Sequence, residues 1–253
     1  MDGIDRTAKL YIGGKQARPD GGYSQPIYSS RGKLLGHTGI GNRKDIRNAV
    51  EAAHAAKGWG KATGHNRAQI LYYIAENLSA RAEEFGQRLK DLTGYNGTAE
   101  VEASIQRLFT YAAWSDKFDG AAKSVPIRGI ALAMNEPVGV IGALSPSTNP
   151  EATPVIKAIN AVKGRNAIVI APHPRAKLTN KLVIDKMREA LVKLGAPADL
   201  VIAIETPTLE KTEELMKQCD RVLATGGAPM VKAAYASGTP ALGVGAGNAV
   251  NLT

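Results

Sequence analysis

The chain has 253 residues, 44% of them hydrophobic, enough for a large buried core, and no apolar stretch is long enough to span a membrane or act as a signal sequence. Its single cysteine, Cys219, excludes an internal disulfide framework, so we expect a cytoplasmic protein without a membrane partner. The formal net charge of +9 is scattered, and aromatic residues make up only 5%, which argues against a nucleic-acid partner and favours anionic, phosphate-bearing ligands.

The first part of the chain, residues 1–122, predicts a β-rich lead-in followed by helices. Asp20-Gly21-Gly22 is a strong turn signal between two extended stretches. The helical patterns that follow run over Ile46–Trp59, Ile70–Leu89 and Val101–Ala112, the second as one long helix. The polar faces carry His54, His65 and acidic residues without the spacing of metal ligands, so we expect no metal site.

Residues 123–136 change in character. Pro126 and Gly129 interrupt any helical pattern there. The segment therefore predicts an extended stretch or a β-hairpin.

The last part of the chain, residues 137–253, alternates apolar strands with helices. This rhythm predicts an α/β fold: a doubly wound parallel sheet of the Rossmann-like, nucleotide-binding type, preceded by the N-terminal helices and the hairpin segment. The predicted strands are Val138–Leu144, Ala167–Ala171, Leu200–Ile204, Val222–Ala224 and Pro240–Val244. The predicted helices are Pro150–Val162, Thr179–Leu194, Leu209–Lys217 and Pro229–Ala236.

Polar turns follow three of these strands, at Ser145–Asn149, Pro172–Arg175 and Thr225–Ala228. Ligands of doubly wound sheets bind at the carboxyl ends of the strands, so we expect the three turns to converge on one site. Gly226 and Gly227 open a helix and carry no side chain that would keep a phosphate away. A plain strand-to-helix turn is the alternative, because glycine is common in such turns.

Several motifs in order carry a resemblance to a known family: LYIGGK (Leu10–Lys15), NEPVGVIG (Asn135–Gly142), STNP (Ser147–Pro150), RNAIVIAPHPRA (Arg165–Ala176) and the stretch Leu223–Asn248. Together they resemble the aldehyde dehydrogenase superfamily over nearly the whole chain. The second half is similar to the CoA-acylating branch, including the aldehyde domain of bifunctional aldehyde–alcohol dehydrogenases. Residues 8–135 look more like the general, non-acylating enzymes.

The resemblance implies an oxidoreductase that uses NAD or NADP to oxidise a small aldehyde, with coenzyme A as co-substrate. It implies a homo-oligomer in the full-length form, with residues 123–136 as the oligomerisation segment. The residues that match family site motifs are Asn149 as the oxyanion-hole asparagine and, as cofactor-binding residues, Ser147 and Thr148 beside it, Pro172, His173 and Pro174 at the adenosine ribose, and Thr225, Gly226 and Gly227 at the pyrophosphate.

Two of these residues have structural alternatives. Asn149 precedes a proline where a helix begins, so it could serve as a helix start. His173 could be a histidine that only stiffens its loop. Beside it, Arg175 and Lys177 are basic where a carboxylate would select the 2′-hydroxyl of NAD, which favours tolerance of the 2′-phosphate of NADP.

Gly243, counted with the cofactor-binding residues, bears on the reaction type. In the hydrolytic branch a glutamate near this position activates water, whereas Gly243–Asn248 contains no carboxylate. A thioester would then persist until an external thiol, coenzyme A, attacks it.

The family's nucleophilic cysteine lies in a catalytic domain beyond this region, and we interpret Cys219 as a structural thiol. We therefore expect the catalytic domain to be absent from this chain, and the chain alone to be inactive. The alternatives are a non-catalytic nucleotide-binding or assembly module, and a fragment of a hydrolytic aldehyde dehydrogenase.

Overall fold

The computed structural model describes residues 7–94, 96–117, 120–124, 126 and 128–244. These fold around a five-stranded sheet in the order β11-β10-β7-β8-β9, with every neighbouring pair parallel. The strands are β7 (Val140–Ser145), β8 (Ala167–Pro172), β9 (Val201–Ala203), β10 (Arg221–Thr225) and β11 (Ala241–Val244). From β7 the chain first adds β8 and β9 on one side. It then returns to the other side of β7 and adds β10 and β11 there. The predicted doubly wound α/β fold is thereby confirmed.

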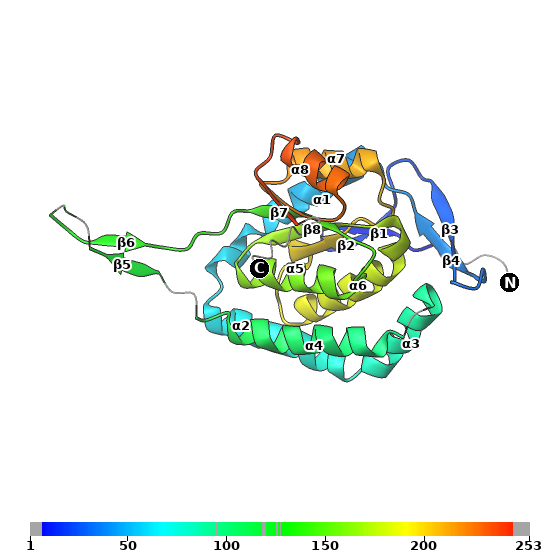
Figure 1. The fold of residues 1–253 in the computed structure, drawn as a ribbon, viewed down its shortest axis with the longest axis horizontal. Helices are drawn as coiled ribbons and strands as arrows, with labels where there is room; N and C mark the ends of the chain where they lie inside the picture. The colour runs from blue at the N-terminus through cyan, green and yellow to red at the C-terminus, as the bar shows by residue number, and fades with distance from the viewer. Residues whose placement is uncertain (1–6, 95, 118–119, 125, 127, 245–253) are drawn as a thin grey trace, which may run out of the picture.

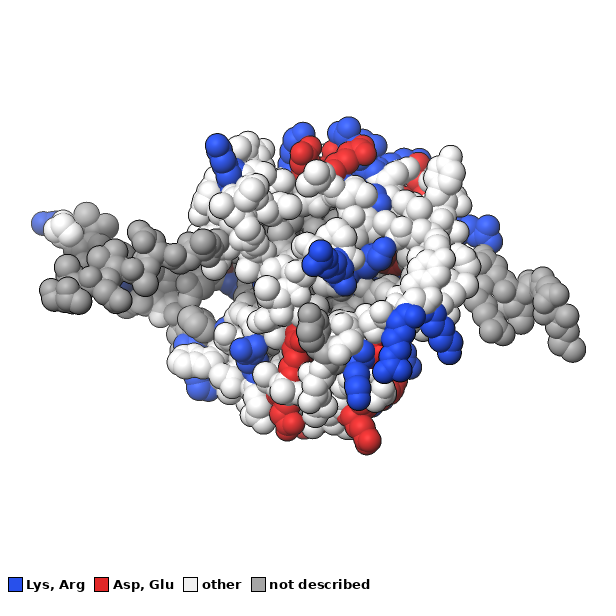
Figure 2. Space-filling model, turned by 45° about the vertical axis from the view of Figure 1, so that its right-hand side comes forward, with Lys and Arg blue, Asp and Glu red and all other residues white. Residues whose placement is uncertain are grey.

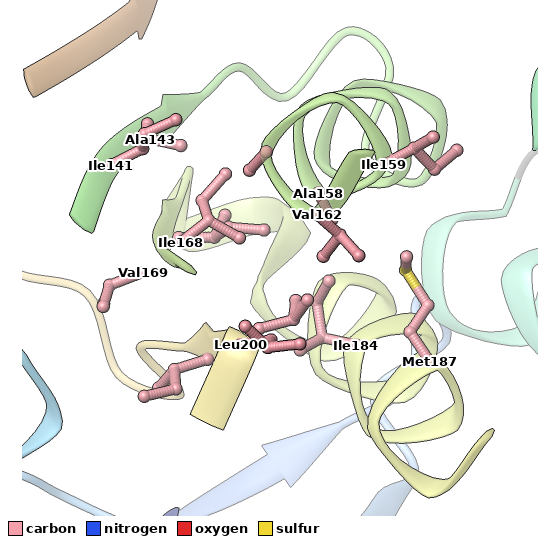
Figure 3. Close-up of a cluster of buried hydrophobic side chains, with 14 of the residues drawn as sticks. Ile141, Ala143, Ala158, Ile159, Val162, Ile168, Val169, Ile184, Met187 and Leu200 are labelled. Carbon is pink, nitrogen blue, oxygen red and sulfur yellow. The ribbon is translucent and has the colours of Figure 1, made fainter. Parts of the chain in front are cut away.

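Helices cover both faces of the sheet, in layers that Figure 1 shows from the side. On one face lie α5 (Ala152–Lys163) and α6 (Lys177–Lys193), and on the other lie α1 (Arg43–Ala55), α7 (Leu209–Gln218) and α8 (Ala228–Tyr235). All six residues of β7 and of β8 are buried, because these central strands are covered on both faces. Figure 3 shows Ile168 of β8, Ile159 of α5 and Ile184 of α6 in one continuous core.

An outer helical layer packs on α5 and α6 and consists of α2 (Gly64–Ser79), α3 (Ala82–Thr93) and α4 (Thr98–Ala113). The single long helix predicted over Ile70–Leu89 is wrong, because the chain breaks at Arg81, whose φ is −121° and ψ 19°. The Arg81 side chain instead binds both carboxylate oxygens of Glu84, at 2.7 and 2.8 Å, and so holds the first turn of α3. The first predicted helix also stops early, since residues Ala56–Lys61 form a 3₁₀ helix after α1.

Three antiparallel hairpins complete the described chain. Two belong to the N-terminal lead-in: β1 (Leu10–Ile12) with β2 (Lys15–Ala17), and β3 (Ser24–Tyr28) with β4 (Leu34–Gly39). The third pairs β5 (Ala121–Lys123) with β6 (Ala131–Ala133), and Figure 1 shows both strands reaching away from the body. This confirms the predicted hairpin, which begins two residues before the expected segment. The domain boundaries drawn from the sequence stay a prediction.

Within the described ranges no helix has both the length and the apolar character needed to cross a bilayer. The same residues hold no cluster of His, Cys, Asp and Glu that could bind a metal ion. Figure 2 shows blue Lys and Arg side chains interspersed with red Asp and Glu over the visible face, without one continuous basic surface. On this face the positive charge is thus not gathered into one patch.

Candidate functional site

A cavity of about 180 Å³ opens at the carboxyl ends of the parallel strands. It lies where the strand order reverses, between β7 and β10, which is where doubly wound sheets bind ligands. Its walls come from three strand ends and from the start of α7. The lining residues are Leu144–Pro146, Ala171–Pro174, Pro207–Leu209, Thr212, Thr225–Gly227 and Met230. All three predicted turns therefore reach one place, although the first does so only through Ser145 and Pro146.

The glycine turn joins β10 to α8. The N–H of Gly226 donates to the carbonyl of Val244 at 3.2 Å, so the sheet uses that group. Gly227 is the N-cap of α8, and Pro229 in the first turn has no N–H. Among the residues that the structure describes, the N–H groups of Gly227 and Ala228 have no protein acceptor. Two free donors at the positive end of a helix favour an anionic ligand here.

The two glycines of this turn are not required by the packing of the protein itself. A Cβ added to Gly226 would meet only Met230, at 3.6 Å, and one added to Gly227 would meet only Pro229, at 3.7 Å. Both are ordinary van der Waals distances, and neither glycine has a positive φ. What the missing side chains preserve is open space in front of the helix.

His173 lines the cavity and begins a short 3₁₀ turn, Pro174–Ala176. Its Nδ1 accepts the backbone N–H of Arg175 at 3.2 Å, which fixes the ring. The neutral ring then carries its proton on Nε2, which is left as a hydrogen-bond donor. Nearby, Arg175 is exposed and Lys177 half-buried. The turn therefore presents one oriented donor and two cations.

Ser147, Thr148 and Asn149 are exposed and do not line the cavity; they follow it on the loop into α5. The N-cap of α5 is Glu151 rather than Asn149, and its side chain makes no capping hydrogen bond. The N–H groups of Glu151 and Ala152 donate instead to Oε1 of Glu100, at 2.9 and 3.2 Å. The side-chain amide of Asn149 makes no hydrogen bond within the described part of the chain, so it does not cap α5, although the Asn149 carbonyl accepts the N–H of Thr153 at 3.3 Å.

Gly243 lies one strand away from the cavity, on β11, and does not line it. Its N–H donates to Oη of Tyr235 at 3.1 Å. A Cβ at this position would meet Cγ1 of Val231 at 2.5 Å, so the packing of α8 on β11 requires glycine. Residues 245–248 of the same motif lie outside the described residues.

Two further residues bear on this site and were not predicted: one contacts a lining residue from α5, and the other lines the cavity. Lys157 of α5 donates through Nζ to the carbonyls of Leu144 at 2.6 Å and of Leu223 at 3.0 Å, which ties β7 to β10 where they diverge. Burial lowers the pKa of Lys157 to about 8. The predicted Pro150–Val162 helix contains Lys157, but no local sequence pattern indicates this contact. Leu209 lines the cavity although 72% exposed, and sequence periodicity had placed it only as a helix residue.

Cys219 is buried behind the sheet and is absent from the cavity lining. A Cβ on Gly142 of β7 would come within 2.6 Å of its Sγ, so the sulfur fills the space left by that glycine. Burial raises the pKa of the Cys219 thiol to about 11. A protonated, enclosed thiol is a poor nucleophile, which agrees with the structural interpretation.

A doubly wound parallel sheet with an open glycine turn at its reversal point is the architecture of the Rossmann-like α/β class. Residues 3–243 match the aldehyde dehydrogenase family, and the chain belongs to that family.

Named relatives place the chain within the family. The succinate-semialdehyde dehydrogenase (acetylating) of Clostridium kluyveri is 36% identical over 214 residues, which cover 83% of this chain and 47% of that protein. The sulfoacetaldehyde dehydrogenase of Acholeplasma sp is 62% identical over 117 residues, 46% of this chain and 24% of that protein. The acetylating relative confirms the resemblance to the acylating branch. The chain thus spans about a quarter to a half of the length of these relatives.

Solved structures show the same fold. The betaine aldehyde dehydrogenase of Staphylococcus aureus in complex with NAD+ matches with a TM-score of 0.85 at 22% identity, over 93% of this chain and 49% of that one. At this identity the likeness establishes the fold.

Proposed function

We propose that the cavity at the carboxyl ends of β7, β8 and β10 binds NAD or NADP, and that the chain is the nucleotide-binding part of a CoA-acylating aldehyde dehydrogenase. The observation that carries this proposal is the turn Thr225–Gly227. It stands at the reversal point of the sheet, offers two free N–H groups, and keeps open a space that the protein does not need for its own packing.

Each part of the cavity has a role toward the dinucleotide. The N–H groups of Gly227 and Ala228, at the start of α8, would hold the pyrophosphate. The Nε2–H of His173 would donate to a hydroxyl of the adenosine ribose. The exposed side chain of Leu209, beside Pro172 and Pro174, offers an apolar surface for the adenine base. Arg175 and Lys177 would favour a 2′-phosphate, which supports NADP as well as NAD.

When bound, the nicotinamide supplies the hydride acceptor of aldehyde oxidation. This chain's contribution at the reacting end is Asn149, whose exposed amide is free to donate to the oxygen that gains negative charge when a thiolate adds to the aldehyde. Ser147 and Thr148 shape the same loop. Since the only cysteine of the sequence is the buried Cys219, we propose that the attacking thiolate is supplied from outside this chain.

The acylating reaction is favoured over hydrolysis by the acetylating relative and by the glycine at 243, where a carboxylate would be needed to activate water. Transfer to coenzyme A would then release the acyl group as a thioester. The β5–β6 hairpin is proposed as an oligomerisation segment, because Ile130, Leu132 and Met134 are exposed there. A non-catalytic binding module stays the second proposal, and the buried state of Cys219 favours it.

Calorimetric titration of the chain with NAD and with NADP tests the binding proposal. We expect one site per chain for at least one of the two nucleotides. Heat of binding for neither would contradict it. The reaction type is tested in the enzyme that holds the catalytic cysteine, by comparing acyl-CoA with free acid when coenzyme A is present. Free acid as the main product would contradict the acylating reaction and would indicate a hydrolytic aldehyde dehydrogenase.

A further inference from the structure

A second cavity, of about 540 Å³, lies at the opposite edge of the sheet from the nucleotide cavity. It opens between the end of α5, the turn into β8, the start of α2 and the segment that leads from the hairpin to β7. Its lining includes three cations, Arg67, Lys163 and Arg165, and one carboxylate, Glu136. Its volume is in the range of small-molecule sites.

The two arginines are held in place by backbone carbonyls. Arg67 of α2 donates to the carbonyl of Ala62 and, at 3.2 Å, to that of Ser115. Arg165 donates to the carbonyl of Asn135 and, at 3.3 Å, to that of Gly60. Each guanidinium is thus fixed through two of its five N–H donors, and the remaining donors are not all used. The Nε of Arg67 is one that has no partner.

In the described chain, the guanidiniums of Arg67 and Arg165 are paired with backbone carbonyls rather than with carboxylates. Neither Arg67 nor Arg165 forms an ion pair with a carboxylate of the described chain. Burial, and after it the neighbouring charge of Arg165, lowers the pKa of Arg67. Two like charges held near each other cost free energy, and an anion between them would offset that cost.

The backbone of Arg165 adds an independent observation. It is the one described residue other than glycine with a positive φ, at 66°. A side chain in this region is strained, whereas glycine adopts it freely. A long cationic side chain kept where glycine would fit better indicates that the guanidinium itself is needed. Lys163, whose Nζ lies 4.8 Å from the ring centre of Tyr111, brings a third charge to the same place.

We propose that this cavity binds a small oxyanion, a phosphate monoester or a sulfonate, at a site separate from that of the nucleotide. Fixed, unneutralised guanidiniums are the groups that recognise such oxygens, because their planar donors match two oxygens of one anion. The site does not rest on the proposed dehydrogenase function. Its residues come from the amino ends of the strands, whereas the nucleotide cavity lies at the carboxyl ends.

Binding of inorganic phosphate and of sulfate tests the site, measured by calorimetry or by thermal shift against chloride at equal ionic strength. Arg165→Gly removes the guanidinium and relieves the positive φ, and Arg67→Gln removes the second charge. We expect each variant to weaken phosphate binding at least tenfold. Arg31→Gln, on an exposed turn, is the matched control and should bind as the unmodified chain does. Phosphate affinity unchanged in both cavity variants, with folding verified by circular dichroism, would overturn the proposal.

Two further experiments identify the source of the anion and distinguish this cavity from the nucleotide cavity. If the anion is the 3′-phosphate of coenzyme A, coenzyme A should displace phosphate and 3′-dephospho-coenzyme A should not; if it is a free metabolite, neither should. Gly226→Val should leave phosphate binding intact while it weakens nucleotide binding. Loss of phosphate binding in Gly226→Val, with none in Arg165→Gly, would assign the anion to the nucleotide cavity and overturn the second site.

Discussion

Glu100 of α4 caps a helix of another layer, accepting through Oε1 the backbone N–H of Glu151 at 2.9 Å. The side chain of Glu151 is itself buried, 1% exposed, with Oε2 2.8 Å from the hydroxyl of Ser104. That hydroxyl also lies 3.0 Å from the carbonyl of Glu100. The Ser104 hydroxyl has one proton and can donate it to only one of these two acceptors. If it donates to the carbonyl of Glu100, a protonated Glu151 forms the other hydrogen bond by donating to the Ser104 oxygen. Burial, followed by the charge of Glu100, raises the pKa of Glu151 to about 8.

This arrangement predicts a pH-dependent stability with a defined sign. The pKa of Glu151 is raised from 4.5 to about 8 on folding, so the folded chain holds a proton that the unfolded chain has lost. Its contribution is complete below about pH 4.5 and is lost as the pH rises through about 8. Glu151→Gln should therefore flatten the fall of the unfolding free energy between these pH values. Denaturant unfolding of both proteins across this range measures it, and an equally steep fall in the variant would contradict it.

Nucleotide binding should depend on the open space at Gly226. In Gly226→Val the Cβ meets no atom closer than 3.6 Å, so the fold should persist while the branched side chain occupies the place of the pyrophosphate. Affinity for NAD or NADP should fall at least tenfold, about 1.4 kcal/mol. Gly36→Val, in β4 and with no atom near its Cβ, is the matched control and should bind normally. Equal affinity in the two variants would remove this turn from the site.

The thiol of Cys219 should be unreactive in the folded chain. Because its pKa is raised to about 11 by burial, a disulfide reagent should label it only after the chain is unfolded. Neither the unmodified chain nor Cys219→Ser should form NADH from an aldehyde. Rapid labelling of the native chain, or aldehyde oxidation that disappears in Cys219→Ser, would show that this sulfur acts as the nucleophile.

A side chain at position 243 should destabilise the protein. In Gly243→Ala the new Cβ would press on Val231 at 2.5 Å, and overpacking of this kind costs about 1–3 kcal/mol. Thermal unfolding should show a lower midpoint than for Gly36→Ala, where the Cβ meets open space. A midpoint as high as that of the control would mean that α8 shifts to accommodate the added methyl group at little cost in stability. In that case a glutamate at 243 could be used to test hydrolysis, which the present packing disfavours.

The sheet and its ligand edge were predictable because they depend on local patterns. Apolar runs such as Ala167–Ala171 are buried on both faces, and the polar turns after them must end at one edge of a parallel sheet. The break at Arg81 was not predictable, since the apolar spacing from Leu78 to Phe85 suits one helix as well as two. Only the tertiary packing of α3 on α4 distinguishes them.

At the site itself, residues that lie in a turn at the end of a strand were easier to predict than residues whose side chains contact a different helix or strand. Pro172, His173 and Gly226 line the cavity as expected, because each sits directly at a strand end. Lys157 reaches two different strands from the middle of α5, and no local pattern encodes such a contact. The glycine at 243 suggested a role in the reaction, but its contacts with Tyr235 and Val231 show that the packing of α8 also limits the side chain at this position.

The central strand of the sheet is also the first of its strands to be synthesised. As the nascent chain leaves the ribosome, β8 follows and covers one edge of β7, but the other edge of β7 waits for β10, roughly 80 residues later. At about 5–20 residues per second, translation leaves that edge unpaired for on the order of 4–16 s. An unpaired edge of a strand as apolar as Val140–Leu144 is a template for another chain. The strand order that places the candidate site between β7 and β10 therefore also leaves one edge of β7 without its partner strand while the chain is being synthesised.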